Sequence, residues 1–119
     1  MSLLASFYLI NNNMRQELSD GDCSGDVYMA IWDYCESELD IDVRFPAPQT
    51  EETLDCALME GKLASDLLEA LQDQNLPKLA AEIAPDWDLN VEAVQSGLET
   101  LCSHLKLVRD DTALLYEMT

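Results

Sequence analysis

The feature that most constrains the fold is an uninterrupted apolar stripe near the end of the chain. Apolar residues recur there at alternating gaps of three and four positions, which places their side chains on one face of an α-helix. Asn90 precedes the stripe and can cap the helix, and Glu92 lies near the positive end of the helix dipole. The sequence therefore predicts a long amphipathic helix with this apolar face: Val91, Val94, Leu98, Leu101, Leu105 and Val108.

A shorter helix is expected immediately before the long one. Asn75 can cap it, and Pro77 fits its first turn, where a missing backbone N–H costs nothing. Pro85 ends it, and residues 63–74 are expected to form a leading helix upstream. Three consecutive helices are thus predicted in the second half of the chain.

The tail then changes period. From residue 105 to 109 a strand would present Leu105, Leu107 and Arg109 on one face and Lys106 and Val108 on the other, and a mostly apolar run at residues 113–118 follows Asp110 and Asp111. This pattern favours two short strands joined by a tight polar turn. A plain helical bundle, in which the tail only continues the last helix, stays open as the alternative.

A helix, a turn, a longer helix and a hairpin follow one another in the order that winged helix-turn-helix domains have, and the chain resembles them in about its last 60 residues. The resemblance rests on element order and not on an invariant motif. In DNA-binding relatives the second helix reads the DNA, so the resemblance implies a surface formed by that helix and the wing tip. Its residues here would be Glu92, Gln95, Ser96, Glu99, Arg109, Asp110 and Asp111.

Charge argues against nucleic acid as the direct ligand of this surface. The chain has 24 acidic and six basic residues and a formal net charge of −18. Such a chain repels phosphate and anionic lipid, so we expect basic protein partners and neither direct nucleic-acid binding nor membrane binding. Residues 1–75 carry a net charge of −13 and residues 76–119 carry −5, so most of the acidity lies outside the winged part. Solubility alone, or the acidic bias of a salt-loving organism, would give the same composition.

The first half of the chain is expected to be helical. A first helix is predicted over residues 2–18, with an early strand at residues 7–10 as the alternative, and a second helix over residues 26–40. The expected domains are an acidic helical part at residues 1–44, a proline-containing connector at 45–50 and a winged-helix-like part at 51–119, in which a helix capped by Thr50 runs to or past Gly61. The predicted fold class is therefore mainly α, a helical N-terminal part followed by a winged-helix-like module with a small C-terminal β-hairpin.

Acidic residues gather at the end of the second predicted helix, where the helix dipole is already negative. Because the arrangement is locally unfavourable, we interpret these carboxylates as an imitation of a phosphate track that binds a basic groove, with a well-solvated acidic face as the alternative. Tyr28 and Trp32 are the candidate aromatic anchors, and together with Leu114 they could form the face of a homodimer; a place for Trp32 in the core is the alternative. The candidate partner-binding residues are Tyr28, Trp32, Asp33, Glu36, Glu38, Asp40 and Asp42.

Sites for chemistry are hard to find in this sequence. His104 is the only histidine, its neighbours Cys102 and Ser103 point in other directions, and the cysteines show no C-x-x-C spacing, so no catalytic pair, metal set or cofactor is expected. Residues 20–27 resemble the first eight positions of an EF-hand loop, but position twelve is Ile31 and not the glutamate that completes a calcium shell. No run is long enough to span a membrane and no export signal is evident, which indicates reduced thiols in a cytoplasm.

These observations predict a small acidic, non-enzymatic, cytoplasmic protein that docks on the basic, nucleic-acid-binding surface of a partner and inhibits or regulates it. Anti-restriction and anti-CRISPR inhibitors and nuclease immunity proteins, which act as DNA mimics, have this size and charge. The alternative is a winged-helix transcriptional regulator or a protein–protein adaptor in a larger complex.

Overall fold

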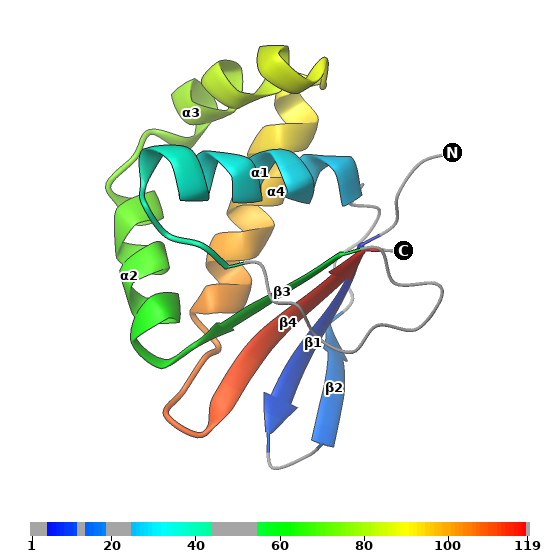
Figure 1. The fold of residues 1–119 in the computed structure, drawn as a ribbon, viewed down its shortest axis with the longest axis vertical. Coiled ribbons are helices and arrows are strands. Elements are labelled where there is room, and N and C mark those ends of the chain that lie inside the picture. The colour runs from blue at the N-terminus through cyan, green and yellow to red at the C-terminus, as the bar shows by residue number, and fades with distance from the viewer. Residues whose placement is uncertain (1–4, 12–13, 19–24, 44–54, 119) are drawn as a thin grey trace.

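One antiparallel sheet of four strands organises the computed structural model, which describes residues 5–11, 14–18, 25–43 and 55–118. The strands are β1 (Ala5–Asn11), β2 (Met14–Leu18), β3 (Asp55–Glu60) and β4 (Thr112–Met118), in the spatial order β2-β1-β4-β3 (Figure 1). The first and last strands are therefore central neighbours, in a register that pairs Phe7 with Tyr116. Strands from the two ends of the chain thus build the middle of the sheet.

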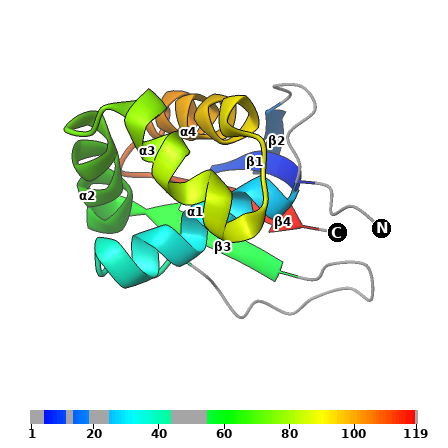
Figure 2. The ribbon, with the colours of Figure 1, turned by 90° about the horizontal axis from the view of Figure 1, so that it is seen from above.

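Four α-helices complete the described part of the chain, and they gather on one side of the sheet (Figure 2). They are α1 (Gly25–Glu38), α2 (Gly61–Gln72), α3 (Leu76–Ile83) and α4 (Val91–Leu105), and a 3-10 turn, η1 (Ala84–Trp87), follows α3. The two predicted caps are confirmed: the side chain of Asn75 accepts a hydrogen bond from the Lys78 N–H, and that of Asn90 accepts one from the Ala93 N–H, each at 3.1 Å.

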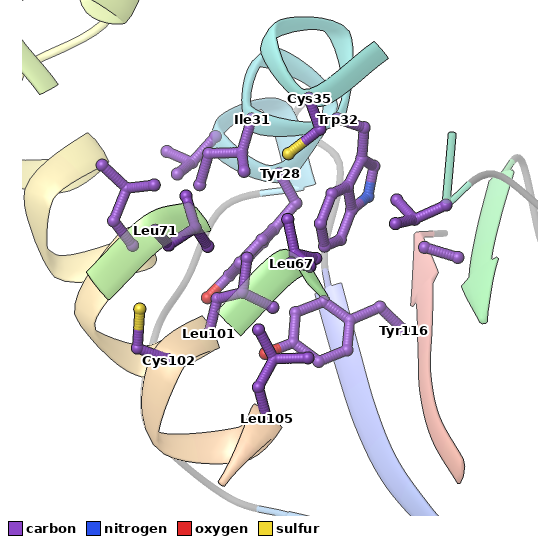
Figure 3. Packing of buried hydrophobic residues seen from close by; sticks show 14 of the residues in the cluster. Tyr28, Ile31, Trp32, Cys35, Leu67, Leu71, Leu101, Cys102, Leu105 and Tyr116 are labelled. Atoms are coloured by element: carbon purple, nitrogen blue, oxygen red, sulfur yellow. The ribbon is translucent and has the colours of Figure 1, made fainter. Parts of the chain in front are cut away.

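The core lies between the helices and one face of the sheet (Figure 3). Phe7 and Tyr116 point from the central strands towards the helices, and their ring centroids are 4.4 Å apart. Tyr28 from α1 packs edge-on to both rings, and Trp32 lies against Tyr116 with the centroids 5.6 Å apart. Because side chains of a strand alternate between faces, Tyr8 and Leu115 lie on the opposite face of the sheet.

A glycine permits a close contact between α1 and α4. In Figure 1, α1 runs across α4, and a Cβ atom added to Gly97 of α4 would lie 2.6 Å from Cγ1 of Val27 in α1. The hydroxyl of Tyr28 also donates a hydrogen bond to the Gly97 carbonyl at 3.4 Å. Position 97 therefore fixes how near α1 and α4 can lie.

The expectation of a helical N-terminal part is wrong for the beginning of the chain. Residues 5–18 contain the hairpin of β1 and β2 and not a helix, and the alternative strand at residues 7–10 is confirmed. The apolar spacing that suggested a helix also fits a strand in so short a run, and aromatic and β-branched residues such as Phe7, Tyr8 and Ile10 favour strands. The second predicted helix is confirmed as α1.

The predicted C-terminal hairpin, and with it the winged-helix-like module, is also wrong. The N–H groups of Leu107 and Val108 donate to the carbonyls of His104 and Leu105, so this segment continues the end of α4 as a turn. The only strand of the tail is β4, which pairs with β1 and β3. The fold class is therefore a sheet covered by helices and not a mainly α chain with a wing.

The second half of the chain also begins differently from the prediction. Residues 55–60 form β3, and α2 starts at Gly61, which has a positive φ of 55°. Glycine adopts this left-handed conformation without the penalty of a Cβ atom, so the strand can turn directly into the helix. The proposed Thr50 cap and the whole 45–50 connector lie outside the described residues, and the sheet joins strands from both sides of that connector.

Candidate functional site

Charge is distributed very unevenly over the helices. Residues 25–43 contain six carboxylates, residues 79–103 contain five, and neither segment contains a lysine or an arginine. We call these two stretches the acidic segments. They are distant in sequence, but they form α1, most of α3, η1 and nearly all of α4, which pack together in the fold (Figure 1). Their exposed acids are Asp33, Glu36, Glu38, Asp40, Asp42, Glu82, Asp86, Asp88, Glu92 and Glu99.

The five acids predicted at the end of α1 are all exposed, but the helix carries only three of them. Asp33, Glu36 and Glu38 lie on α1, whereas Asp40 and Asp42 follow it. Asp40 adopts a left-handed conformation with φ of 56°, and the N–H of Ile41 returns to the Cys35 carbonyl at 2.9 Å. The carboxylates therefore lie along a helix and a turned segment, and not along one straight helical track.

Tyr28 and Trp32 are not surface anchors. Both are fully buried, with 0% and 1% of their surface exposed, and both contact the ring of Tyr116. Leu114 is likewise completely buried, so the dimer face suggested from these three residues does not exist at the surface. Tyr28 and Trp32 lie one turn apart on the face of α1 that packs against the sheet. The Trp32 indole nitrogen lacks a hydrogen-bond partner, so packing alone holds the ring.

A different aromatic residue lies among the exposed acids. Trp87, the last residue of η1, is 41% exposed and lines a groove between α1 and the α3–η1 corner. Asp88, in a left-handed conformation, turns the chain, and the Leu89 N–H donates to the Ala84 carbonyl at 2.9 Å, which fixes the corner. We call this pocket of about 300 Å³ the Trp87 groove; its side chains include Asp33, Tyr34, Glu38, Glu82, Asp86 and Trp87.

The pKa of Tyr34 is affected by acids from both sides of this groove. Partial burial raises the pKa of the Tyr34 hydroxyl above its ordinary value, and the nearby charges of Glu82, Cys35 and Glu38 raise it further. Glu82 comes from α3 and Glu38 from α1, so carboxylates from two helices act on one phenol. The phenol therefore stays protonated and can offer a hydrogen bond within the groove.

Sequence reasoning missed four side chains of this groove: Tyr34, Glu82, Asp86 and Trp87. No periodicity connects residues 33–38 with residues 82–87, because only the packing of α1 against α3 brings them together. The local signal was the turn around Trp87, where an aromatic residue lies between Asp86 and Asp88 just after Pro85. An apolar ring in so polar a turn is poorly placed to join the core.

The residues that the winged-helix resemblance groups into one surface lie in two places. Glu92, Gln95, Ser96 and Glu99 lie on the outer side of α4, where the Gln95 amide donates to the Glu99 carboxylate at 3.1 Å. Arg109, Asp110 and Asp111 occupy the exposed turn between α4 and β4, and the Thr112 hydroxyl accepts a 2.6 Å hydrogen bond from the Arg109 N–H. This turn borders a second groove, which also contains Lys62 and Lys106. Three of the six cations of the chain thus meet on one groove away from the acidic segments.

The histidine and the two described free cysteines are buried. His104 is 2% exposed, and its Nδ1 shares a hydrogen bond with the Tyr116 hydroxyl inside the core. Cys35 and Cys102 are free and buried, and burial raises the pKa of the Cys35 thiol to about 12 and raises that of Cys102. Within the described ranges no three metal-ligating side chains converge, and residues 20–24 of the EF-hand-like stretch lie outside them.

Comparisons with known proteins add no relative. No protein-family model, no curated protein and no solved structure matches the chain. Among the residues that the structure describes, no helix combines the length and the apolar character needed to cross a bilayer. Any functional conclusion therefore rests on the charges, grooves and side chains of this chain itself.

Proposed function

We propose that this chain is a non-enzymatic binding protein whose acidic segments dock on a basic surface of a partner protein, of the kind that binds nucleic acid, and thereby inhibit or regulate that partner. The observation that carries the proposal is the separation of charge in the fold. Two sequence-distant segments without lysine or arginine pack side by side, and ten of their carboxylates are exposed. A basic protein surface is the complement of such an array.

Two ion pairs between described residues lie away from the acidic segments. Arg15 pairs with Glu117 at the sheet, and Lys62 pairs with Asp66 on α2, so neither cation serves α1, η1 or α4. Like charges held close together repel one another, and a partner's lysines and arginines relieve that repulsion on binding. A surface that binds nucleic acid already carries such cations in an array that matches closely spaced negative charges.

Buried chemistry supports a binding role over a catalytic one. The histidine and the two described free thiols lie in the core, where a substrate cannot reach them without unfolding. The Cys35 thiol, with its pKa raised to about 12, is almost entirely in the unreactive neutral form near neutral pH. Cys35 and Cys102 form no disulfide, and unpaired cysteines are typical of reducing compartments, which supports the proposed cytoplasmic location.

Affinity capture from host lysate, with duplex DNA as the competitor, tests the proposal. The immobilised chain should retain a basic nucleic-acid-binding protein at low salt and release it both at about 0.5 M salt and on addition of the duplex. Release by DNA is the decisive readout, since it requires that the chain and the DNA use the same surface of the partner. Recovery of no basic protein, or of a complex that resists both salt and DNA, would overturn the proposal in favour of an adaptor.

A gel shift of the isolated chain with mixed-sequence duplex at low salt provides the matching control. No shift is expected, because the exposed surface of the acidic segments repels phosphate. A shifted band would mean that the chain binds DNA directly, which contradicts a role as its competitor.

A further inference from the structure

The Trp87 groove combines an exposed aromatic ring with convergent carboxylates. Trp87 is 41% exposed at the η1 corner, and tryptophan is enriched among the residues that anchor protein interfaces. The backbone at Trp87 is held in place by the turn at Asp88 and by the hydrogen bond from the Leu89 N–H to the Ala84 carbonyl. The ring is therefore presented to the solvent by the backbone.

The carboxylates surround this ring from two helices. Asp33 and Glu38 reach the groove from α1, and Glu82 and Asp86 reach it from α3 and η1. The acidic segments that build the groove contain no lysine or arginine, and the ion pairs between described residues lie elsewhere. The groove thus has carboxylates on both walls and the aromatic ring of Trp87 beside them.

The size of the groove limits its occupant. Its volume of about 300 Å³ is at the lower end of the range for ligand pockets, so it suits one long side chain and not a helix or a strand. A guanidinium group is planar, donates hydrogen bonds in a fork that matches a carboxylate, and stacks on aromatic rings. Indole is the strongest aromatic partner for a cation. Arginine satisfies all of these features, whereas lysine offers a compact charge that can lie over the ring but has no planar fork for a carboxylate.

We propose that the Trp87 groove receives an arginine side chain of the basic partner, with the guanidinium stacked on Trp87 and bonded to carboxylates of the two walls. This inference rests on the proposed function and names the point of the surface at which the partner is anchored. A second copy of the chain is a poor occupant, because two chains with a net charge of −18 repel each other.

Titration calorimetry with two peptides of about eight residues, one rich in arginine and one rich in lysine at equal charge, tests the groove. The arginine peptide should bind at least about fivefold more tightly than the lysine peptide, because only guanidinium stacks and bonds in a fork. Trp87→Ala should weaken binding of the arginine peptide by at least about tenfold without changing the charge of the protein. Leu107→Ala is the matched control, since it also removes an exposed apolar side chain (43% exposed) but lies outside the groove, and it should leave the affinity unchanged.

A pair of charge-neutralising variants separates the groove from diffuse attraction. Glu82→Gln with Asp86→Asn removes two carboxylates of the groove, and Glu92→Gln with Glu99→Gln removes two exposed carboxylates of α4. The groove variant should lose at least about tenfold more affinity than the α4 variant. Equal losses in the two variants, equal affinity for the two peptides, or an unaltered affinity of Trp87→Ala would each overturn the proposal.

Tryptophan fluorescence gives a second readout that needs no substitution. Trp32 is 1% exposed and Trp87 is 41% exposed, so quenching by acrylamide reports mainly on Trp87. The arginine peptide should protect the emission from quenching, and unaltered quenching at saturation would contradict the proposal.

If a captured partner is released by DNA but groove variants bind it normally, the proposed function stands and the arginine site fails. If the arginine peptide binds the groove but no basic protein is captured, the arginine site stands and the proposed function fails.

Discussion

At the scale of single residues, Gly97 determines whether α1 and α4 can pack as they do. Helix propensity alone favours replacing this glycine, because alanine is better in a helix by about 1 kcal/mol. The structure opposes that preference, since a Cβ at position 97 would lie 2.6 Å from Val27 Cγ1 and 3.4 Å from Ile31 Cδ1. Valine cannot move its methyl group cheaply, because its side chain has one torsion and branches at Cβ.

We expect Gly97→Ala to lower the free energy of unfolding by about 1–3 kcal/mol, as overpacked core positions do. Urea denaturation followed by circular dichroism measures the change. Ser96→Ala, at the exposed neighbouring position of α4, is the control and should stay within about 0.5 kcal/mol of the parent chain. A Gly97→Ala variant as stable as the parent would mean that α1 and α4 are farther apart than described.

At the scale of elements, β4 distinguishes the observed fold from a winged one. In a wing, the tail would pair with the segment just before it and project from the domain with one face in solvent. In the structure β4 lies between β1 and β3, and Leu114 and Tyr116 are fully buried beneath the helices. The two arrangements therefore predict different costs for truncating Leu114.

Leu114→Ala should destabilise the chain by about 2–5 kcal/mol, because it opens a cavity in the core. Leu107→Ala, in the turn after α4, should change stability by no more than about 0.5 kcal/mol, since that side chain is 43% exposed. Thermal or chemical denaturation of both variants measures the difference. Similar small losses in the two would favour a peripheral hairpin over a central strand.

The elements differ in how far the sequence predicted them, and the reason is the range of the interactions that decide each one. α3 and α4 depend on local signals, a cap and an apolar stripe, and both were predicted with their caps at Asn75 and Asn90. β1 and β4 depend on pairing between residues such as Phe7 and Tyr116, which are more than a hundred positions apart. No local pattern records that partner, so Phe7 was assigned to a helix. Short apolar runs fit either structure until the partner is known.

The candidate surface was likewise predictable only where local sequence determines it. The exposed acids of α1 were visible as a cluster in the sequence, whereas Tyr28 and Trp32 were wrongly placed with them, because one helix presents a buried and an exposed face at neighbouring positions. Trp87 could not be joined to Asp33 or Glu38 without the packing of α3 against α1. Composition therefore indicated that the surface is negatively charged, whereas the packing of the helices determines its shape.

At the scale of the whole molecule, the separation of charge is the property on which the proposed function depends. The cations Lys62, Lys106 and Arg109 gather at one groove, while residues 25–43 and 79–103 contribute only negative charge. Solubility alone does not require two adjoining segments without a cation. A docking surface for a basic partner is favoured by such segments, because a neighbouring lysine would compete with the partner's own, and Lys78 of α3 marks the edge of this surface.

The most direct measurement of this claim compares two triple variants in the lysate capture assay. One replaces Asp33, Glu36 and Glu38 by lysine, and the other replaces Glu17, Glu69 and Asp73, exposed acids of β2 and of α2 with its C-terminal cap, so that both variants change the net charge equally. Lysine at the end of α1 also suits the helix dipole, so loss of folding is not expected to explain a loss of binding.

The α1 triple should reduce capture of the DNA-displaceable partner by orders of magnitude, whereas the control triple should retain most of it. Circular dichroism of both variants verifies that the fold is kept. An equal reduction in the two would mean that overall charge, and not the acidic segments, attracts the partner. Unchanged capture by the α1 triple would contradict the account outright.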